Sequence, residues 1–230
     1  MRSSLTLRSS IAVAGLAVAA SAYAGNTTIV TNALVADSVQ AFSTDAAGAF
    51  EVQSVSVTPL GNATAVSGAA TPSFSLPITS ITIDSKLQIV SGDAKGSALK
   101  FARTTTAGTE VWVVLANFTI DYVNKKVLAD TTIPGVATVK QQAIYSFATS
   151  SALSIKYKFP LSITGHEVLN QLMLTEETKD SFMNGLKLYS FIRAVLDATD
   201  FGTLTQDIAV KLRSKPVSTK LYTVSQTTAQ

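Results

Sequence analysis

The chain has 230 residues, of which 47% are hydrophobic and 14% are charged, and it contains no cysteine. This composition supplies enough apolar residues for a sizeable core and excludes disulfides, thiol nucleophiles and thiolate metal sites. The net charge of +3 includes Arg2 and Arg8, and from residue 25 onward 16 Lys and Arg face 15 Asp and Glu. We therefore expect no nucleic-acid partner.

Residues 1–24 have the three regions of a secretory signal peptide. Arg2 and Arg8 form a charged start, residues 11–20 form a short apolar run, and the small residues Ala22 and Ala24 precede Gly25. The apolar run is too short to span about 30 Å of hydrocarbon. The sequence predicts cleavage after Ala24 and a single exported domain, residues 25–230, that is periplasmic, cell-surface or extracellular. We expect no integral membrane segment after signal removal, and the lack of cysteine favours a bacterial source.

The first third of the mature chain predicts short strands. Residues 28–30 and 50–57 have strand character and are joined through the turn-prone residues 45–48, while residues 33–42 fit a short helix as well as a strand. In residues 74–83 the apolar alternation slips by one position, which predicts a β-bulge or a break between two strands.

The middle of the chain continues the pattern with longer strands. Residues 91–96 predict a hairpin connection, and residues 110–121 predict a central strand that is apolar on both faces. In that strand Trp112, Val114, Ala116, Phe118 and Ile120 alternate with Val111, Val113 and Leu115. Residues 153–163 alternate strictly and predict one strand near the rim of the sheet, with Pro160 at an edge or bulge.

The period of the apolar pattern changes after Gly165. Residues 168–173 have helical spacing, Thr175 followed by two glutamates is typical of a helix start, and Gly185 predicts a break between two shorter helices. We therefore predict a mainly β fold, an antiparallel β-sandwich or open barrel, with a short helical insert near residues 166–198 that caps one end.

The single histidine, His166, does not by itself indicate a catalytic site. Its neighbour Glu167 is expected to point the other way, and His166 is expected to flank a helix start. A catalytic role would require His166 to face a nucleophile or a carboxylate in a cleft. One histidine without cysteine also makes a zinc site improbable.

The remaining candidate residues have structural explanations. Ser97 and Lys100 match the S-x-x-K pattern of penicillin-interacting enzymes, but in a strand they face opposite sides. Glu176 and Glu177 are explained as helix first-turn acids, and Trp112 as a packing residue. The acids Glu51, Glu110 and Asp121 have no partner that the sequence reveals. We therefore predict no catalytic, cofactor-binding or metal-binding residue.

The sequence thus favours an exported, non-catalytic structural or adhesive protein of the periplasm, cell surface or extracellular matrix, for which self-association through sheet edges is one way to assemble. Two alternatives stay open. The first is a module that holds a small apolar or sugar ligand in a concave pocket under the helices of residues 175–196. The second is a hydrolase with an unrecognised carboxylate pair, which requires titratable groups converging in a cleft.

Overall fold

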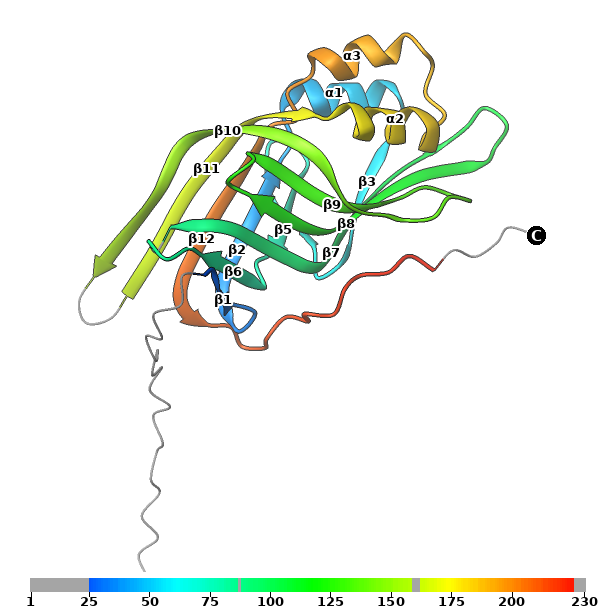
Figure 1. Cartoon of the computed structure of the whole chain (residues 1–230). Helices are drawn as coiled ribbons and strands as arrows, with labels where there is room; N and C mark the ends of the chain where they lie inside the picture. Colours follow the sequence, from blue (N-terminus) through cyan, green and yellow to red (C-terminus); the bar gives the residue numbers. More distant parts are fainter. Residues whose placement is uncertain (1–24, 87, 159–161, 226–230) are drawn as a thin grey trace, which may run out of the picture.

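The computed structural model describes residues 25–86, 88–158 and 162–225. The predicted signal peptide and Pro160 lie outside the described residues. Twelve strands form one antiparallel sheet, and three short helices gather at one end of it (Figure 1). Among the described residues, every helix is too short or too polar to cross a membrane.

The strands are β1 (Thr27–Val30), β2 (Leu34–Ala41), β3 (Ser56–Gly61), β4 (Thr64–Ala65), β5 (Ser73–Pro77), β6 (Ser80–Ile83), β7 (Ile89–Thr104), β8 (Glu110–Asp121), β9 (Lys126–Thr132), β10 (Val139–Lys158), β11 (Ser162–Leu174) and β12 (Thr203–Leu212). The helices are α1 (Thr44–Val52), α2 (Glu176–Gly185) and α3 (Ile192–Ala198).

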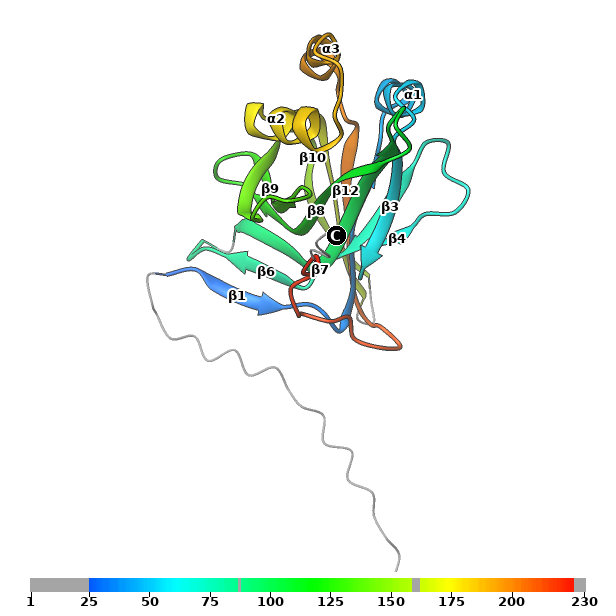
Figure 2. The same cartoon turned by 90° about the vertical axis from the view of Figure 1, so that its right-hand side faces the viewer.

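The sheet curls into a half-barrel. Its strand order is β1-β6-β7-β8-β9-β10-β11-β12-β2-β5-β4, with β3 added on β7. Strands β1 and β6 lie at one end of this order, and β2 and β5 lie near the other end. Only residues 31–33 join β1 to β2, and only residues 78–79 join β5 to β6. These two short connections therefore bring the two ends of the sheet together. The Thr31 backbone N–H in one connection donates to the Thr79 carbonyl in the other at 2.9 Å. The sheet is therefore curled around an interior, as the views in Figures 1 and 2 show. The mainly β, antiparallel prediction is confirmed in its open form.

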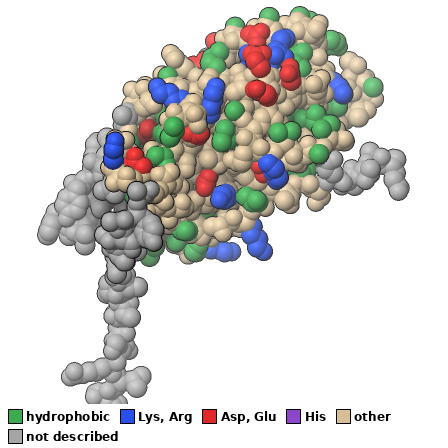
Figure 3. All heavy atoms as spheres, viewed as in Figure 1, with side chains coloured by type: hydrophobic (Ala, Val, Ile, Leu, Met, Phe, Trp, Pro, Cys, Tyr) green, Lys and Arg blue, Asp and Glu red, His purple; other side chains and the backbone are tan. Residues whose placement is uncertain are grey.

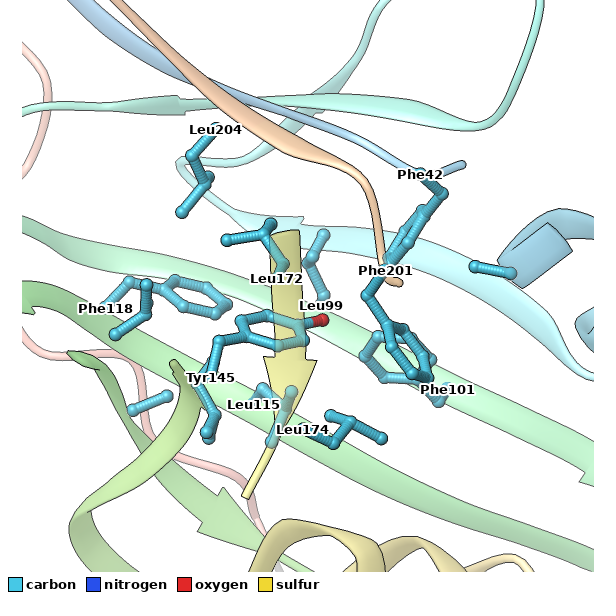
Figure 4. Packing of buried hydrophobic residues seen from close by; sticks show 14 of the residues in the cluster. Phe42, Leu99, Phe101, Leu115, Phe118, Tyr145, Leu172, Leu174, Phe201 and Leu204 are labelled. Carbon is cyan, nitrogen blue, oxygen red and sulfur yellow. The ribbon is translucent and has the colours of Figure 1, made fainter. Parts of the chain in front are cut away.

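The hydrophobic core fills the curl and continues under the helices. Phe101 is fully buried in it near Phe42 (Figure 4), with its ring 6.1 Å from that of Phe42 and 4.9 Å from that of Phe182 on α2. Edge-to-face packing of this kind is the preferred geometry of aromatic pairs. The helices are thus extensions of the same core, and they cover one end of the curl.

Strand β8 has the predicted bounds, but its two faces were assigned wrongly beyond Ala116. Asn117 has a positive φ of 55°, and the register with β9 shifts between Ala116 and Thr119. This bulge exchanges the two sides of the strand. Phe118 and Ile120 consequently face the interior core together with Val113 and Leu115, and not with Trp112.

The predicted turn at residues 45–48 is wrong, because these residues lie in α1. Ser43 caps this helix: its hydroxyl accepts a hydrogen bond from the Ala46 N–H at 3.0 Å, and Asp45 lies in the first turn. The predicted strand at 50–57 therefore begins only at Ser56. The ambiguous residues 33–42 form strand β2.

The helical insert begins later than predicted, because residues 166–174 belong to strand β11. Leu169 and Leu172 are both buried although they lie three residues apart. Gln171, with φ 52°, and a register shift against β10 explain this spacing, since a bulge adds one residue to the alternation. The predicted helices are confirmed as α2 and α3, and α2 ends at Gly185.

One strand prediction and one hairpin prediction also need correction. Residues 153–163 form no single strand, because β10 ends at Lys158 and β11 begins at Ser162, which pairs with it. Residues 91–96 are no hairpin connection but part of the long strand β7, which carries a register shift between Ala94 and Ala98. The break predicted in residues 74–83 is confirmed as the boundary between β5 and β6.

Candidate functional site: a groove in the helical cap

The three helices enclose an open apolar groove with a volume of about 450 Å³. We call residues 44–52 and 175–200 the helical cap; α1 lies on one side of the groove, with α2 and α3 on the other (Figure 2). Its lining is mostly aliphatic and aromatic, and Asp45 is the charged residue in it. The lining residues are Thr44, Asp45, Gly48, Ala49, Phe50, Val52, Gln53, Val55, Phe182, Leu186, Leu188, Ile192, Val195, Leu196, Thr199 and Phe201. Val52 is 78% exposed and Val195 is 42% exposed, so apolar surface there is open to solvent.

Helix α2 packs closely on the sheet. Phe182 reaches into the core, and Gly185 lies so close to β8 that a Cβ added there would come within 2.7 Å of Ile133 Cγ2 and closer still to Val113. Thr178 donates to the Ala143 carbonyl at 3.1 Å. Thr175 does not cap the helix as predicted, because its hydroxyl also donates to that carbonyl.

Helix α1 is held much more loosely. Ala46 is its one buried residue, and Phe50 is its half-buried aromatic anchor. A second hollow of about 540 Å³ lies on its other side, lined by Ala47, Glu51 and residues 70–72 among others. Because α1 has open space on both sides, it is the wall of the groove that can move most easily.

The surface around the groove is acidic. The helical cap contains seven Asp and Glu against three Lys and Arg. Lys179 and Arg193 lie within a network of Glu176, Asp180 and Asp197, in which Lys179 Nζ is 2.8 Å from Glu176 and 2.7 Å from Asp197. The hydrogen bonds from Lys179 and Arg193 lower the pKa of Glu176. These ion pairs fasten α3 to α2 and leave the cap with a net negative charge (Figure 3).

Two exposed aromatic rings stack on each other on the loop between α2 and α3. Tyr189 is 57% exposed and Phe191 is 67% exposed, and their rings are stacked with centroids 5.8 Å apart and nearly parallel planes. Exposed aromatic side chains are typical of surfaces that bind other molecules.

A second set of polar groups is buried inside the curl. Glu167, Gln206 and Ser38 are register partners across β11, β12 and β2, so their side chains lie in a row on the inner face. The Tyr122 hydroxyl donates to Glu167 Oε2 at 2.6 Å, and Gln206 Nε2 donates to Ser38 Oγ at 2.8 Å. Burial raises the pKa of Glu167, and the bond from Tyr122 offsets part of that rise. The adjoining void is about 30 Å³, which has room for water but not for a larger ligand.

His166 lies in strand β11 and not at a helix start. As expected, it faces away from Glu167, which is buried, but it does face a carboxylate: His166 Nδ1 is 2.8 Å from Asp207 Oδ1 on β12. The pair lies in a depression of about 260 Å³ that is also lined by Asp37. The two side chains are 51% and 63% exposed, so water screens the pair, whereas a catalytic aspartate is buried. We interpret it as a cross-strand surface pair.

The other residues singled out in the sequence remain dispersed. Ser97 is buried, while Lys100 forms an ion pair with Glu110 at 2.6 Å, so the two residues of the S-x-x-K match do not meet. Trp112 packs with Leu60 on the outer face of the sheet. Among the described residues, no group of three or more His, Asp or Glu could hold a metal ion.

Sequence reasoning located the pocket under α2 and α3 but missed its second wall, α1. The available signal was Ser43 followed by Asp45, a helix start that was interpreted as a turn. The His166–Asp207 pair was also missed, because only the register of β11 with β12 brings these residues together.

Comparisons with known proteins yield one distant structural likeness. No family model matches the chain, and no curated protein matches it. The C-terminal domain of HtaA from Corynebacterium glutamicum is similar in structure, with a TM-score of 0.46 and 14% sequence identity over 76% of this chain and 97% of that one. The function of the chain is therefore inferred from its own geometry.

Proposed function

We propose that this is an exported, non-catalytic structural or adhesive protein that binds an apolar segment of another protein in the groove of the helical cap. One observation carries the proposal: an open groove of about 450 Å³ whose apolar lining includes the exposed Val52 and Val195. Apolar surface of this kind on a folded domain is typical of binding sites. The acidic surroundings favour a partner that is uncharged or basic.

The export part of the proposal is supported by the sequence of residues 1–24. The non-catalytic part is supported by the dispersal of the candidate residues and by the exposure of the His166–Asp207 pair.

A small apolar ligand in the same groove is the second candidate. Its support is the groove volume, which falls within the roughly 300–1,000 Å³ that small-molecule sites usually have. Both candidates require that the groove accept uncharged apolar material, and this can be measured with an uncharged fluorescent dye such as Nile red.

The test compares Val52→Glu and Val195→Glu with Val123→Glu. The first two place a carboxylate in the groove lining, whereas Val123, 73% exposed in the β8–β9 connection, is outside it. We expect saturable dye fluorescence with the native chain and the Val123 variant, and a loss of about tenfold in affinity with each groove variant. Equal binding by all four proteins would place the apolar site elsewhere and refute the proposal.

A further inference from the structure

The C-terminal segment, residues 209–225, has the properties that the groove requires of a partner. It contains Lys211, Arg213, Lys215 and Lys220 and no acidic residue, and of these Arg213 is already paired with Asp37 at 2.8 Å. The helical cap, in contrast, has an excess of four acidic residues over basic ones. Opposite charges of this size steer two surfaces toward each other and fix their orientation.

Apolar side chains accompany the positive charges of this segment. Leu212 is 73% exposed and Leu221 is 53% exposed, and each lies next to a basic residue in the chain. Alternating basic and leucine side chains complement a surface that combines carboxylates with Val52 and Val195.

The C-terminal segment is held in an extended form by asparagine side chains. Asn32 Nδ2 donates to the Val217 carbonyl, Asn62 Nδ2 donates to the Ser218 carbonyl, and Asn117 exchanges two hydrogen bonds with the Tyr222 backbone at 2.7 and 2.9 Å. Tyr222 and Val224 face the sheet, while Lys220 and Leu221 remain exposed. The backbone that carries the exposed side chains is thus already held in place, which lowers the entropy cost of binding.

The two surfaces lie at different ends of the molecule. The helical cap is at the top in Figures 1 and 2, and the C-terminal segment runs along the lower side. Basic side chains are visible at the lower edge of Figure 3 and acidic ones over the helices. A contact between a surface at one end and a different surface at the other joins copies head to tail, and it leaves both ends of the product open for further copies.

We propose that the groove and acidic rim of the helical cap bind residues 209–225 of a second copy of this chain. This inference rests on the proposed function and names its partner. It differs from the edge pairing expected from the sequence, for which β1 is one available edge strand: β1 is exposed along its whole length and, among the described strands, pairs with β6 alone. Edge pairing, however, does not explain why the helical cap is acidic and the C-terminal segment basic.

The test is sedimentation velocity of the mature chain over a range of concentrations in about 0.05 M and about 1 M NaCl. We expect concentration-dependent association that weakens at least about tenfold at 1 M salt, where the Debye length falls to about 3 Å. Lys215→Glu/Lys220→Glu should weaken association at least about tenfold in low salt. The matched control Lys86→Glu/Lys125→Glu changes the net charge equally at other exposed positions and should change the affinity less than about twofold.

A charge exchange makes the test specific for head-to-tail contact. Asp45→Lys/Glu177→Lys cancels the excess of four negative charges on the cap, with Asp45 in the groove lining, and this variant should also fail to associate alone. Mixing it with the Lys215→Glu/Lys220→Glu variant should restore dimers, because the native cap of that variant can bind the native C-terminal segment of the first.

A chain that stays monomeric, equal effects of the two lysine pairs, or assembly that is lost only on deleting residues 25–30 would each overturn the inference. These results are distinct from failure of the proposed function. Saturable Nile red binding by a chain that remains monomeric would retain the groove and reject the second copy.

Discussion

The two helices that face each other across the groove differ in how they are held. Helix α2 inserts Phe182 into the core and lies against β8 at Gly185, whereas α1 buries Ala46 alone and has a hollow on each side. The groove therefore has one fixed wall and one that can adjust. This arrangement suits the binding of an extended segment, because a shift of α1 disturbs the core mainly at Ala46 and at Phe50, whose ring packs on Phe42.

The largest expected difference between the walls concerns their aromatic anchors. Phe182→Ala removes a ring that is 3% exposed and packs edge-to-face on Phe101, and we expect a loss of about 3–5 kcal/mol in the free energy of unfolding. Phe50→Ala, on α1, removes a half-buried ring and should cost clearly less, about 1–2 kcal/mol. Urea unfolding followed by circular dichroism measures both values. Equal losses would show that α1 is anchored as firmly as α2.

A second comparison uses the close approach at Gly185. The methyl group of Gly185→Ala would overlap Val113 and lie within 2.7 Å of Ile133 Cγ2, so α2 must move away from the sheet. We expect a loss of about 1–3 kcal/mol, as is usual for overpacking. Dye binding should change as well, because the fixed wall has moved. A fully stable Gly185→Ala variant would contradict the close packing described for α2.

Gly48 on α1 provides the matched control, because replacement of this glycine by alanine is expected to raise stability. Its position is helical, and a Cβ added there meets no atom within 4 Å. Gly48→Ala should therefore stabilise the chain by up to about 1 kcal/mol through the higher helix propensity of alanine. Thermal unfolding can detect this gain. A loss of stability would indicate that space beside α1 is not free.

The sequence was informative for the long apolar run of β8, and it failed where a bulge or a tight turn interrupts a strand. The bounds of β8 were predicted correctly because residues 110–121 alternate without Gly or Pro. The bulge at Asn117 then exchanged the two faces, and the bulge at Gln171 gave β11 the spacing of a helix. A positive φ at a non-glycine residue depends on tertiary hydrogen bonds, such as those of Asn117 with Asp130 and Tyr222, and it leaves little trace in the local sequence.

The candidate site, like the strands, could be predicted from the sequence only in part. The positions of α2 and α3 could be predicted from their apolar spacing, so a pocket beneath them could be expected. The opposite wall could not, because α1 is short and alanine-rich and lacks a clear apolar stripe. Long-range pairs such as His166 with Asp207 are determined by strand register, which a single sequence does not specify.

The smallest expected effect is a difference in pH dependence between Glu176, which holds α3 on α2, and Glu167, which lies in the interior of the sheet. Glu176 has a lowered pKa, so its contribution to holding α3 on α2 is present above the ordinary glutamate value of 4.5 and is lost as the pH falls through the folded-state value. Glu167 has a raised pKa, so its contribution has the opposite sign and is lost as the pH rises through the folded-state value. Protection against hydrogen exchange, expressed relative to the intrinsic exchange rate at each pH, should therefore fall in α2 and α3 on acidification. In Glu176→Gln this acid-dependent change should largely disappear, while α1 is weakly protected at every pH.

The predicted pH dependence of the Glu167 contribution is tested with Glu167→Gln, which keeps the shape of the side chain and removes its charge. The difference in unfolding free energy between this variant and the native chain should move in favour of the variant as the pH is raised from 4 to about 8. Tyr122→Phe separates the hydrogen bond from the charge and should cost about 1–2 kcal/mol, because Glu167 Oε2 loses its 2.6 Å donor. If the difference in unfolding free energy for Glu167→Gln does not change with pH, Glu167 has the same pKa in the folded and unfolded chains. Of the two regions compared, the helical cap would then be the one whose stability depends on pH.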